Sequence, residues 1–147
     1  MKKKSIIFFI AIILAVSITG IIFIMPGKKG STDAVHRIIG TSALYDEELI
    51  SKAFDAVENK FSSDFKDCTL TELRYDRTVE NKFTDEMLKY NTLHNQKLII
   101  VSSDFETNRK ARDLGLIPNE TYEGWTWSLK ETDTQQAWEV IDGGWGY

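Results

Sequence analysis

The sequence has little of the chemistry from which active sites and metal sites are usually built. Among its 147 residues are one cysteine and two histidines. One cysteine excludes an intrachain disulfide, and we expect Cys68 to be a small buried side chain at the start of a strand. His36 and His94 fit no zinc-binding spacing, and neither lies beside a recognisable nucleophile motif. We therefore predict no catalytic residue, no metal site and no cofactor.

Positive charge is scarce beyond the N-terminal segment. Residues 1–30 contain five lysines and no acidic residue, so residues 31–147 carry the other 13 basic residues and all 22 acidic ones, a net charge of −9. Nucleic-acid-binding domains usually present a basic patch to the phosphates. We therefore predict no nucleic-acid partner, and we interpret the acidic surface as a source of solubility.

What the sequence does have is one long uncharged run. Residues 5–25 follow three lysines and contain no charged side chain. As a helix they would be roughly 31 Å long, about the thickness of the hydrocarbon core of a bilayer. The alternative is a signal peptide cleaved near Ser17, but the apolar run continues to Met25. A lipoprotein would need a cysteine at the end of the run, where none occurs.

These features predict a two-part chain. Residues 1–30 would be a membrane anchor and the start of a tether, and residues 31–147 a single extracytoplasmic domain. The lysines at positions 2–4 favour a cytoplasmic N-terminus, although Lys28 and Lys29 follow the apolar run. The prediction is a single-pass protein of the cell membrane with its main domain outside.

Within that domain, helical and strand patterns alternate. Residues 46–62 begin with a good N-cap, Asp46, and carry an apolar stripe at helical spacing, formed by Ile50, Ala53, Phe54, Val57 and Phe61. Residues 68–75 form a predicted strand, residues 78–90 a second helix, and residues 97–105 a central strand because both faces are apolar. Residues 35–39 fit either a short strand or a simple lead into the domain. Residues 106–124 predict a long irregular connection.

The tryptophans all lie in the last part of the chain. Trp125 and Trp127 alternate with polar residues, and Trp138 begins a second alternating run, which is the pattern of strands with one buried face. We predict an antiparallel hairpin whose three tryptophans form the floor beneath the helix at residues 46–62.

Three aromatic residues of this region are candidates for a different role. Trp145 and Tyr147 lie among glycines at the end of the chain, where the alternation of apolar and polar residues does not predict burial. Tyr122 is the first residue of the aromatic-rich segment 122–147. Tryptophan and tyrosine are favoured in binding surfaces because they combine apolar area with a polar group. We predict Trp145, Tyr147 and Tyr122 as ligand-binding residues.

The order of the predicted elements indicates an α+β domain. We expect a small antiparallel sheet of about four strands with the helices packed on one face. By analogy of element order alone, cystatin-like and nuclear-transport-factor-like sheets are the nearest architectures.

Several stretches give the chain a resemblance to a family of small, uncharacterised, membrane-tethered or lipoprotein-like proteins of Gram-positive bacteria. They are the acidic cluster at residues 46–48, residues 65–71 with Leu73, Tyr75 and Asp76, residues 103–105, Pro118-Asn119, Thr121-Tyr122, residues 125–127, residues 138–140 and residues 145–147. The lipid-attachment cysteine of some of these relatives is missing here. The resemblance implies a location at the membrane but no activity and no catalytic residues.

Two functional hypotheses follow. The first is a non-catalytic extracytoplasmic domain that binds a protein or a cell-envelope ligand. The alternative is a small extracytoplasmic hydrolase that uses acidic residues of the 106–124 connection, which requires two carboxyl groups facing each other across a pocket.

Overall fold

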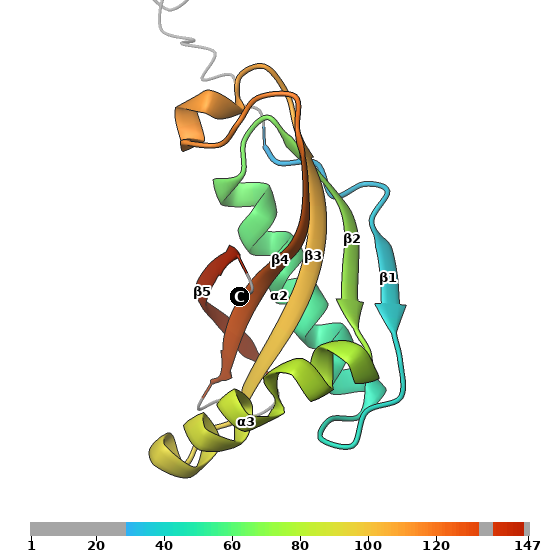
Figure 1. Cartoon of the computed structure of the whole chain (residues 1–147), viewed down its shortest axis with the longest axis vertical. Coiled ribbons are helices and arrows are strands. Elements are labelled where there is room, and N and C mark those ends of the chain that lie inside the picture. Colours follow the sequence, from blue (N-terminus) through green and yellow to red (C-terminus); the bar gives the residue numbers. More distant parts are fainter. Residues whose placement is uncertain (1–28, 133–136, 146–147) are drawn as a thin grey trace, which may run out of the picture.

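The computed structural model describes residues 29–132 and 137–145, with the backbone alone described at Trp145. In chain order its elements are β1 (His36–Ile39), α2 (Glu47–Asp64), β2 (Cys68–Tyr75), α3 (Arg77–His94), β3 (Leu98–Thr107), the 3-10 helix η1 (Ala111–Leu114), β4 (Thr121–Glu131) and β5 (Trp138–Trp145). The described part is therefore α+β, as the patterns predict (Figure 1).

The strands form one five-stranded sheet in the order β1-β2-β3-β4-β5. The predicted antiparallel sheet of about four strands is wrong in one respect, because β1 joins the sheet parallel to β2 while the other pairs are antiparallel. The cause is the helix between the first two strands. Parallel neighbours need a crossover connection, and α2 supplies one between β1 and β2, so residues 36–39 become a parallel edge strand.

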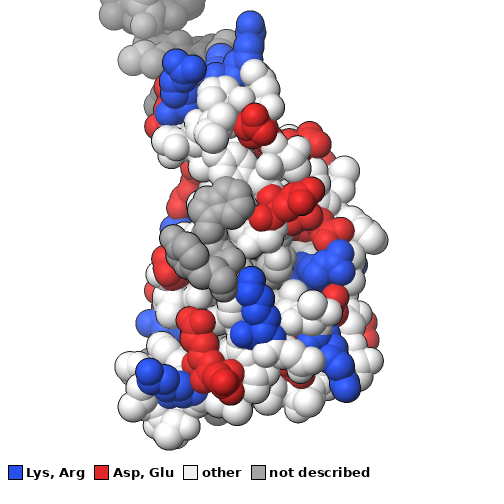
Figure 2. Space-filling model, viewed as in Figure 1, with Lys and Arg blue, Asp and Glu red and all other residues white. Residues whose placement is uncertain are grey.

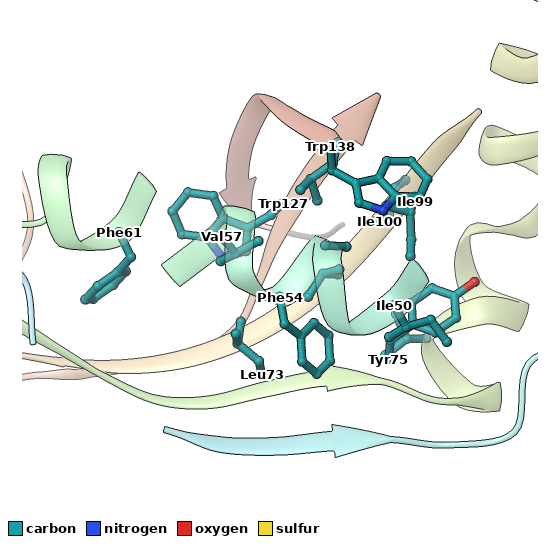
Figure 3. Close-up of a cluster of buried hydrophobic side chains, with 14 of the residues drawn as sticks. Ile50, Phe54, Val57, Phe61, Leu73, Tyr75, Ile99, Ile100, Trp127 and Trp138 are labelled. Carbon is teal, nitrogen blue, oxygen red and sulfur yellow. The ribbon is translucent and has the colours of Figure 1, made fainter. Parts of the chain in front are cut away.

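Helix α2 packs along one face of the sheet. Asp46 caps it by accepting a hydrogen bond from the backbone N–H of Leu49 at 2.8 Å. The buried residues of the helix are the predicted stripe, which Figure 3 shows facing side chains of the sheet. The floor beneath it includes Trp127 and Trp138, both buried, and the half-buried Trp125. The predicted packing of this helix on the tryptophan hairpin is thus confirmed.

Helix α3 does not share that face. In Figure 1, α2 lies behind the sheet and α3 crosses in front of the lower end of β3, which it contacts. Ile99 and Val101 are buried on one face of β3, and the alternating Leu98 and Ile100 are buried on the other. The first residues of β3 are apolar on both faces, so both faces need cover. The prediction of helices on one face is therefore wrong.

A bulge changes which residues of β2 are buried. Its register against β3 shifts between Leu70 and Glu72. Cys68 and Leu70 are buried before the shift, and Leu73 and Tyr75 after it. An inserted residue reverses the alternation of faces, so both halves of the strand contribute to the core. Cys68 is buried at the start of the strand, as predicted.

The connection between the last long strands is shorter than predicted. β3 continues to Thr107 and β4 begins at Thr121, and the segment between them contains η1. Among the described residues, no helix is long and apolar enough to cross a membrane. The anchor predicted at residues 5–25 lies outside the described residues.

Candidate functional site

A groove opens between α2 and β5. β5 is an edge strand, because it lies last in the sheet order. Its first residue, Trp138, is fixed to the helix: the indole Nε1–H donates a hydrogen bond to the carbonyl of Leu49 at 2.9 Å, and the ring packs edge-on against Tyr45. Beyond this attachment the helix and the strand enclose an open groove of about 620 Å³.

The lining of the groove mixes charged, polar and apolar side chains. It is lined by Lys52, Asp55, Ala56, Asn59, Lys60 and Ser63 of α2 and by residues 137–140 at the start of β5. Several rim charges are balanced locally. Lys60 Nζ lies 2.8 Å from Asp64, Lys130 Nζ lies 3.2 Å from Glu139, and Arg37 pairs with Asp55 at 2.6 Å. The rim therefore favours neither sign of ligand charge strongly.

An aromatic pocket continues the groove toward the end of α2. It has a volume of about 210 Å³, shares Lys60 and Val140 with the groove, and has Phe65, Trp125 and Trp127 in its wall. The Phe65 ring packs edge-on against Trp125 at 6.0 Å and against Trp127 at 5.3 Å between centroids. An apolar side chain of a ligand would meet three aromatic rings here.

The strand β5 can pass close to these rings because position 143 is glycine. A Cβ atom at Gly143 would lie 3.2 Å from the ring of Trp127 and 3.3 Å from Nε1 of Trp125. A larger residue would therefore push the strand away from the aromatic floor. A second pocket of about 190 Å³ lies on the other side of Phe65 and Trp125, where Asp64, Leu114 and Leu116 complete the wall.

The three predicted ligand-binding residues do not form one site in the described structure. Tyr122 is buried: its ring stacks on Phe105 at 4.9 Å, and its hydroxyl oxygen accepts a hydrogen bond from the N–H of Ile117 at 2.8 Å. Its visible role is to hold the loop that precedes β4. The backbone of Trp145 pairs with Trp125, whereas Tyr147 lies outside the described residues. Ligand binding by these three residues stays a prediction.

Sequence reasoning missed the groove residues. Asp55, Asn59 and Lys60 are ordinary polar positions of an amphipathic helix, and only the position of β5 makes them a wall. Phe65 follows the last helical residue and has no periodicity to place it. The one available signal was the pair Gly143-Gly144 beside the tryptophans, because glycine within a strand often marks a close approach.

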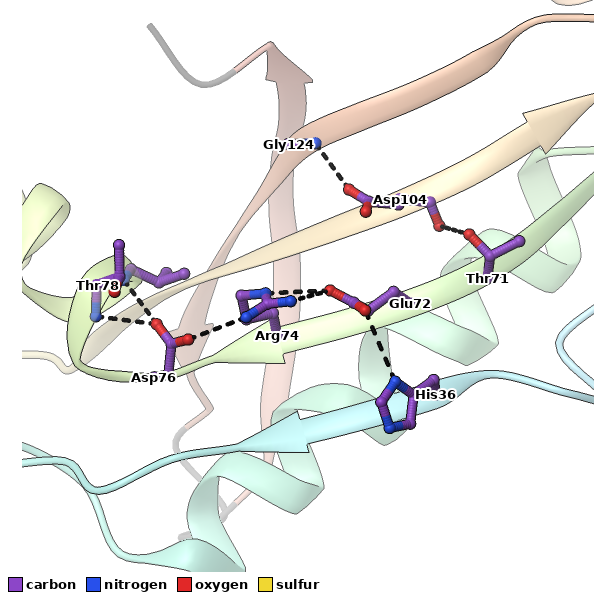
Figure 4. A network of polar contacts seen from close by, with 9 residues as sticks. His36, Thr71, Glu72, Arg74, Asp76, Thr78, Asp104 and Gly124 are labelled. Carbon is purple, nitrogen blue, oxygen red and sulfur yellow. Dashed lines mark hydrogen bonds and ion pairs between the residues drawn. The ribbon is translucent and has the colours of Figure 1, made fainter.

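The face of the sheet opposite α2 carries a polar network (Figure 4). Arg74 lies between Glu72 and Asp76, with N–O distances of 2.6 and 3.2 Å. Asp76 also caps α3 by accepting hydrogen bonds from the N–H groups of Thr78 and Val79. Burial raises the pKa of Asp76, but these hydrogen bonds and the bond from Arg74 together hold it below its ordinary value. The network orders the corner between β2 and α3.

Acidic residues of the 106–124 segment do not converge. The side chains of Glu106, Asp113, Glu120 and Glu123 are all exposed. In the part of the chain that the structure describes, no three His, Cys, Asp or Glu side chains are grouped so that they could hold a metal ion.

Comparison with protein-family models, with curated proteins and with solved structures finds no match to this chain.

Proposed function

We propose that the protein is a membrane-anchored, extracytoplasmic, non-catalytic binding domain whose ligand is an extended segment of another protein. The observation that supports this function best is the open groove between α2 and the edge strand β5. The proposed location rests on the apolar run at residues 5–25 and on the lysines that precede it.

An edge strand beside a helix suits an extended ligand. The outer edge of a terminal strand presents backbone N–H and C=O groups that another strand can pair with. When a peptide adds to a sheet in this way, backbone hydrogen bonds supply affinity and pockets for alternate side chains supply specificity. Here the groove would hold the peptide backbone along β5. The pocket between Phe65 and Trp125 would take one apolar side chain.

The alternative function, hydrolysis by acidic residues, has less support. That mechanism needs two carboxyl groups close together in a pocket, with the pKa of one raised. The acidic residues of the 106–124 segment are exposed on the surface. We therefore favour binding over catalysis.

The experiment is to fill the groove. Ala56 is half-buried in its wall, so Ala56→Arg should occupy the groove without removing a core side chain. Ala34→Arg is the matched control, because Ala34 is exposed outside the groove. The full chain in lipid nanodiscs would be used to select peptides from a random displayed library. Selected peptides should bind the parent and the Ala34→Arg protein, and should bind the Ala56→Arg protein at least about tenfold more weakly, a loss of about 1.4 kcal/mol.

Two results would overturn the proposal. One is equal peptide binding by the Ala56→Arg and Ala34→Arg proteins, which would place the site elsewhere. The other is a selection that enriches no peptide over empty nanodiscs. Peptidoglycan fragments, as the cell-envelope ligand, would be titrated against the same three proteins. Binding of such fragments that Ala56→Arg abolishes would reassign the groove to the cell wall.

A further inference from the structure

The loop between β3 and β4 displays apolar and basic side chains together. Leu114 is 39% exposed and Ile117 is 62% exposed. Three basic residues, Arg109, Lys110 and Arg112, are exposed in the same loop. Single exposed apolar residues are ordinary on protein surfaces. Two of them within four positions, next to three positive charges in a domain of net charge −9, need an explanation.

The exposure is a fixed property of the loop. Ala111, the first residue of η1, is fully buried, and the hydroxyl of Tyr122 accepts a hydrogen bond from the N–H of Ile117. The Thr107 hydroxyl donates to the carbonyl of Ile117 at 2.7 Å and accepts from the N–H of Glu120 at 2.9 Å. The backbone around Ile117 is therefore held from both sides, while its side chain remains exposed.

The loop lies at the end of the domain where the described chain begins. The N–H of Gly30 donates to the carbonyl of Ser62 at 3.0 Å, and the N–H of Ser31 donates to the carbonyl of Cys68 at 2.9 Å. From the same turn, the carbonyl of Asp67 accepts a hydrogen bond from the N–H of Asn108 at 3.1 Å. Figure 1 shows the start of the described chain and η1 at one end of the molecule, and Figure 2 shows Lys and Arg side chains at that end, with Asp and Glu side chains close by.

Chain length then brings this end close to the bilayer. The predicted membrane segment ends at Met25, four residues before Lys29. Four extended residues span at most about 14 Å, and the headgroup layer outside the hydrocarbon core is about 5–8 Å thick. A domain anchored so closely has its Lys29 end at the headgroups.

We propose that the 109–117 loop docks on the surface of the anionic bilayer in which the chain is anchored. Leu114 and Ile117 would enter the boundary between headgroups and acyl chains, while Arg109, Lys110 and Arg112 would contact lipid phosphates. Docking would fix the orientation of the domain and hold the α2–β5 groove at a set height above the membrane. This inference rests on the membrane anchor of the proposed function, and not on the ligand of the groove.

The test places a fluorescent probe at two positions of the full chain reconstituted into vesicles. Leu114→Cys carries the probe in the loop, and Leu93→Cys carries it near the end of α3, where Leu93 is 68% exposed. The parent protein, whose Cys68 is buried, is the labelling blank. Vesicles contain phosphatidylcholine alone or an equal mixture of phosphatidylcholine and phosphatidylglycerol, each with a spin-labelled lipid that quenches the probe.

Docking predicts stronger quenching at position 114 than at position 93 in the anionic vesicles. Each basic side chain near an anionic surface contributes about fivefold to the docking equilibrium. Replacing Arg109, Lys110 and Arg112 together by Gln should therefore reduce quenching at position 114 to the level at position 93. The matched change Lys89→Gln on α3 should leave the quenching unchanged.

Three results would overturn the proposal in different ways. If the chain floats with the vesicles but the two positions are quenched equally, docking is wrong while the anchor stands. If quenching at position 114 is the same in neutral vesicles, the basic residues have no role. If the chain does not float with vesicles at all, the anchor fails, and the proposed location fails with it.

Discussion

The buried carboxylate of Glu80 offers the sharpest test of how the fold is held together. Glu80 lies in the first turns of α3 and is 4% exposed. Its oxygens accept hydrogen bonds from the hydroxyl of Ser42, from the N–H of Ala43 at 2.9 Å and from the hydroxyl of Tyr75 at 3.0 Å. These contacts tie the connection between β1 and α2 to the junction between β2 and α3.

The perturbation is Glu80→Gln, which keeps the size of the side chain and removes its charge. A hydrogen bond to a charged acceptor contributes about 1.5–3 kcal/mol, and an unsatisfied buried donor costs about 1–3 kcal/mol. The amide of Gln can accept on one oxygen, but its NH2 group would face other donors. We therefore expect Glu80→Gln to lower the free energy of unfolding by about 2–3 kcal/mol. Glu80→Ala should cost more, because all three donors then lose their acceptor.

The effect should also depend on pH. Burial raises the pKa of Glu80, but the hydrogen bonds from Ser42, Ala43 and Tyr75, with a smaller effect of the Leu44 backbone, hold the pKa below its ordinary value of 4.5. A lowered pKa in the folded state means that the carboxylate stabilises the fold fully above the unfolded pKa. That contribution is lost as the pH falls through the folded pKa. The difference between parent and variant should therefore be constant near neutral pH and shrink in acid.

Urea unfolding of the full chain in detergent, followed by tryptophan fluorescence, measures both quantities. Glu86→Gln on the exposed side of α3 is the control, and should change the free energy of unfolding by less than about 0.5 kcal/mol. The reasoning is refuted if Glu80→Gln behaves like Glu86→Gln at neutral pH. It is also refuted if the difference between parent and Glu80→Gln stays the same in acid.

Three further predictions concern the core and the chain ends. Gly30→Ala should lower the free energy of unfolding by about 1–3 kcal/mol, because the added Cβ atom would lie 2.6 Å from the carbonyl oxygen of Phe61. Gly144→Ala is the control: its Cβ atom would have no atom within 4 Å, so it should lower the free energy of unfolding far less in the same urea titration. Burial, with a smaller effect of Asp67, raises the pKa of the Cys68 thiol to about 11. A disulfide reagent at neutral pH should therefore react slowly with the folded protein and fast only in urea. Fast reaction without urea would contradict the burial of Cys68. Trp127→Ala should lower the free energy of unfolding by about 3–5 kcal/mol. Trp145→Ala should weaken ligand binding without unfolding the domain. Equal destabilisation by the two substitutions would remove the support for a binding role of Trp145.

Local sequence patterns determined the elements well where one residue spacing dominates. The apolar stripe of α2 and its Asp46 cap were readable because helical periodicity and capping act within a few residues. The strand at Cys68–Tyr75 and the central position of β3 followed from alternation and from apolar residues on both faces. The polar connections were placed less well, since the strand ends at Thr107 and Thr121 depend on pairing with neighbours.

Contacts between distant segments were decided only by the tertiary structure. Periodicity shows that a face is apolar, but not which element covers it. The sequence therefore did not show that β1 lies parallel to β2 or that α3 packs across one end of β3. Tyr122 illustrates the same limit: as a sequence feature it resembled an interface aromatic, and the fold buries it against Phe105. The groove exists because β5, far along the chain, comes to lie beside α2, and no local pattern encodes that neighbour.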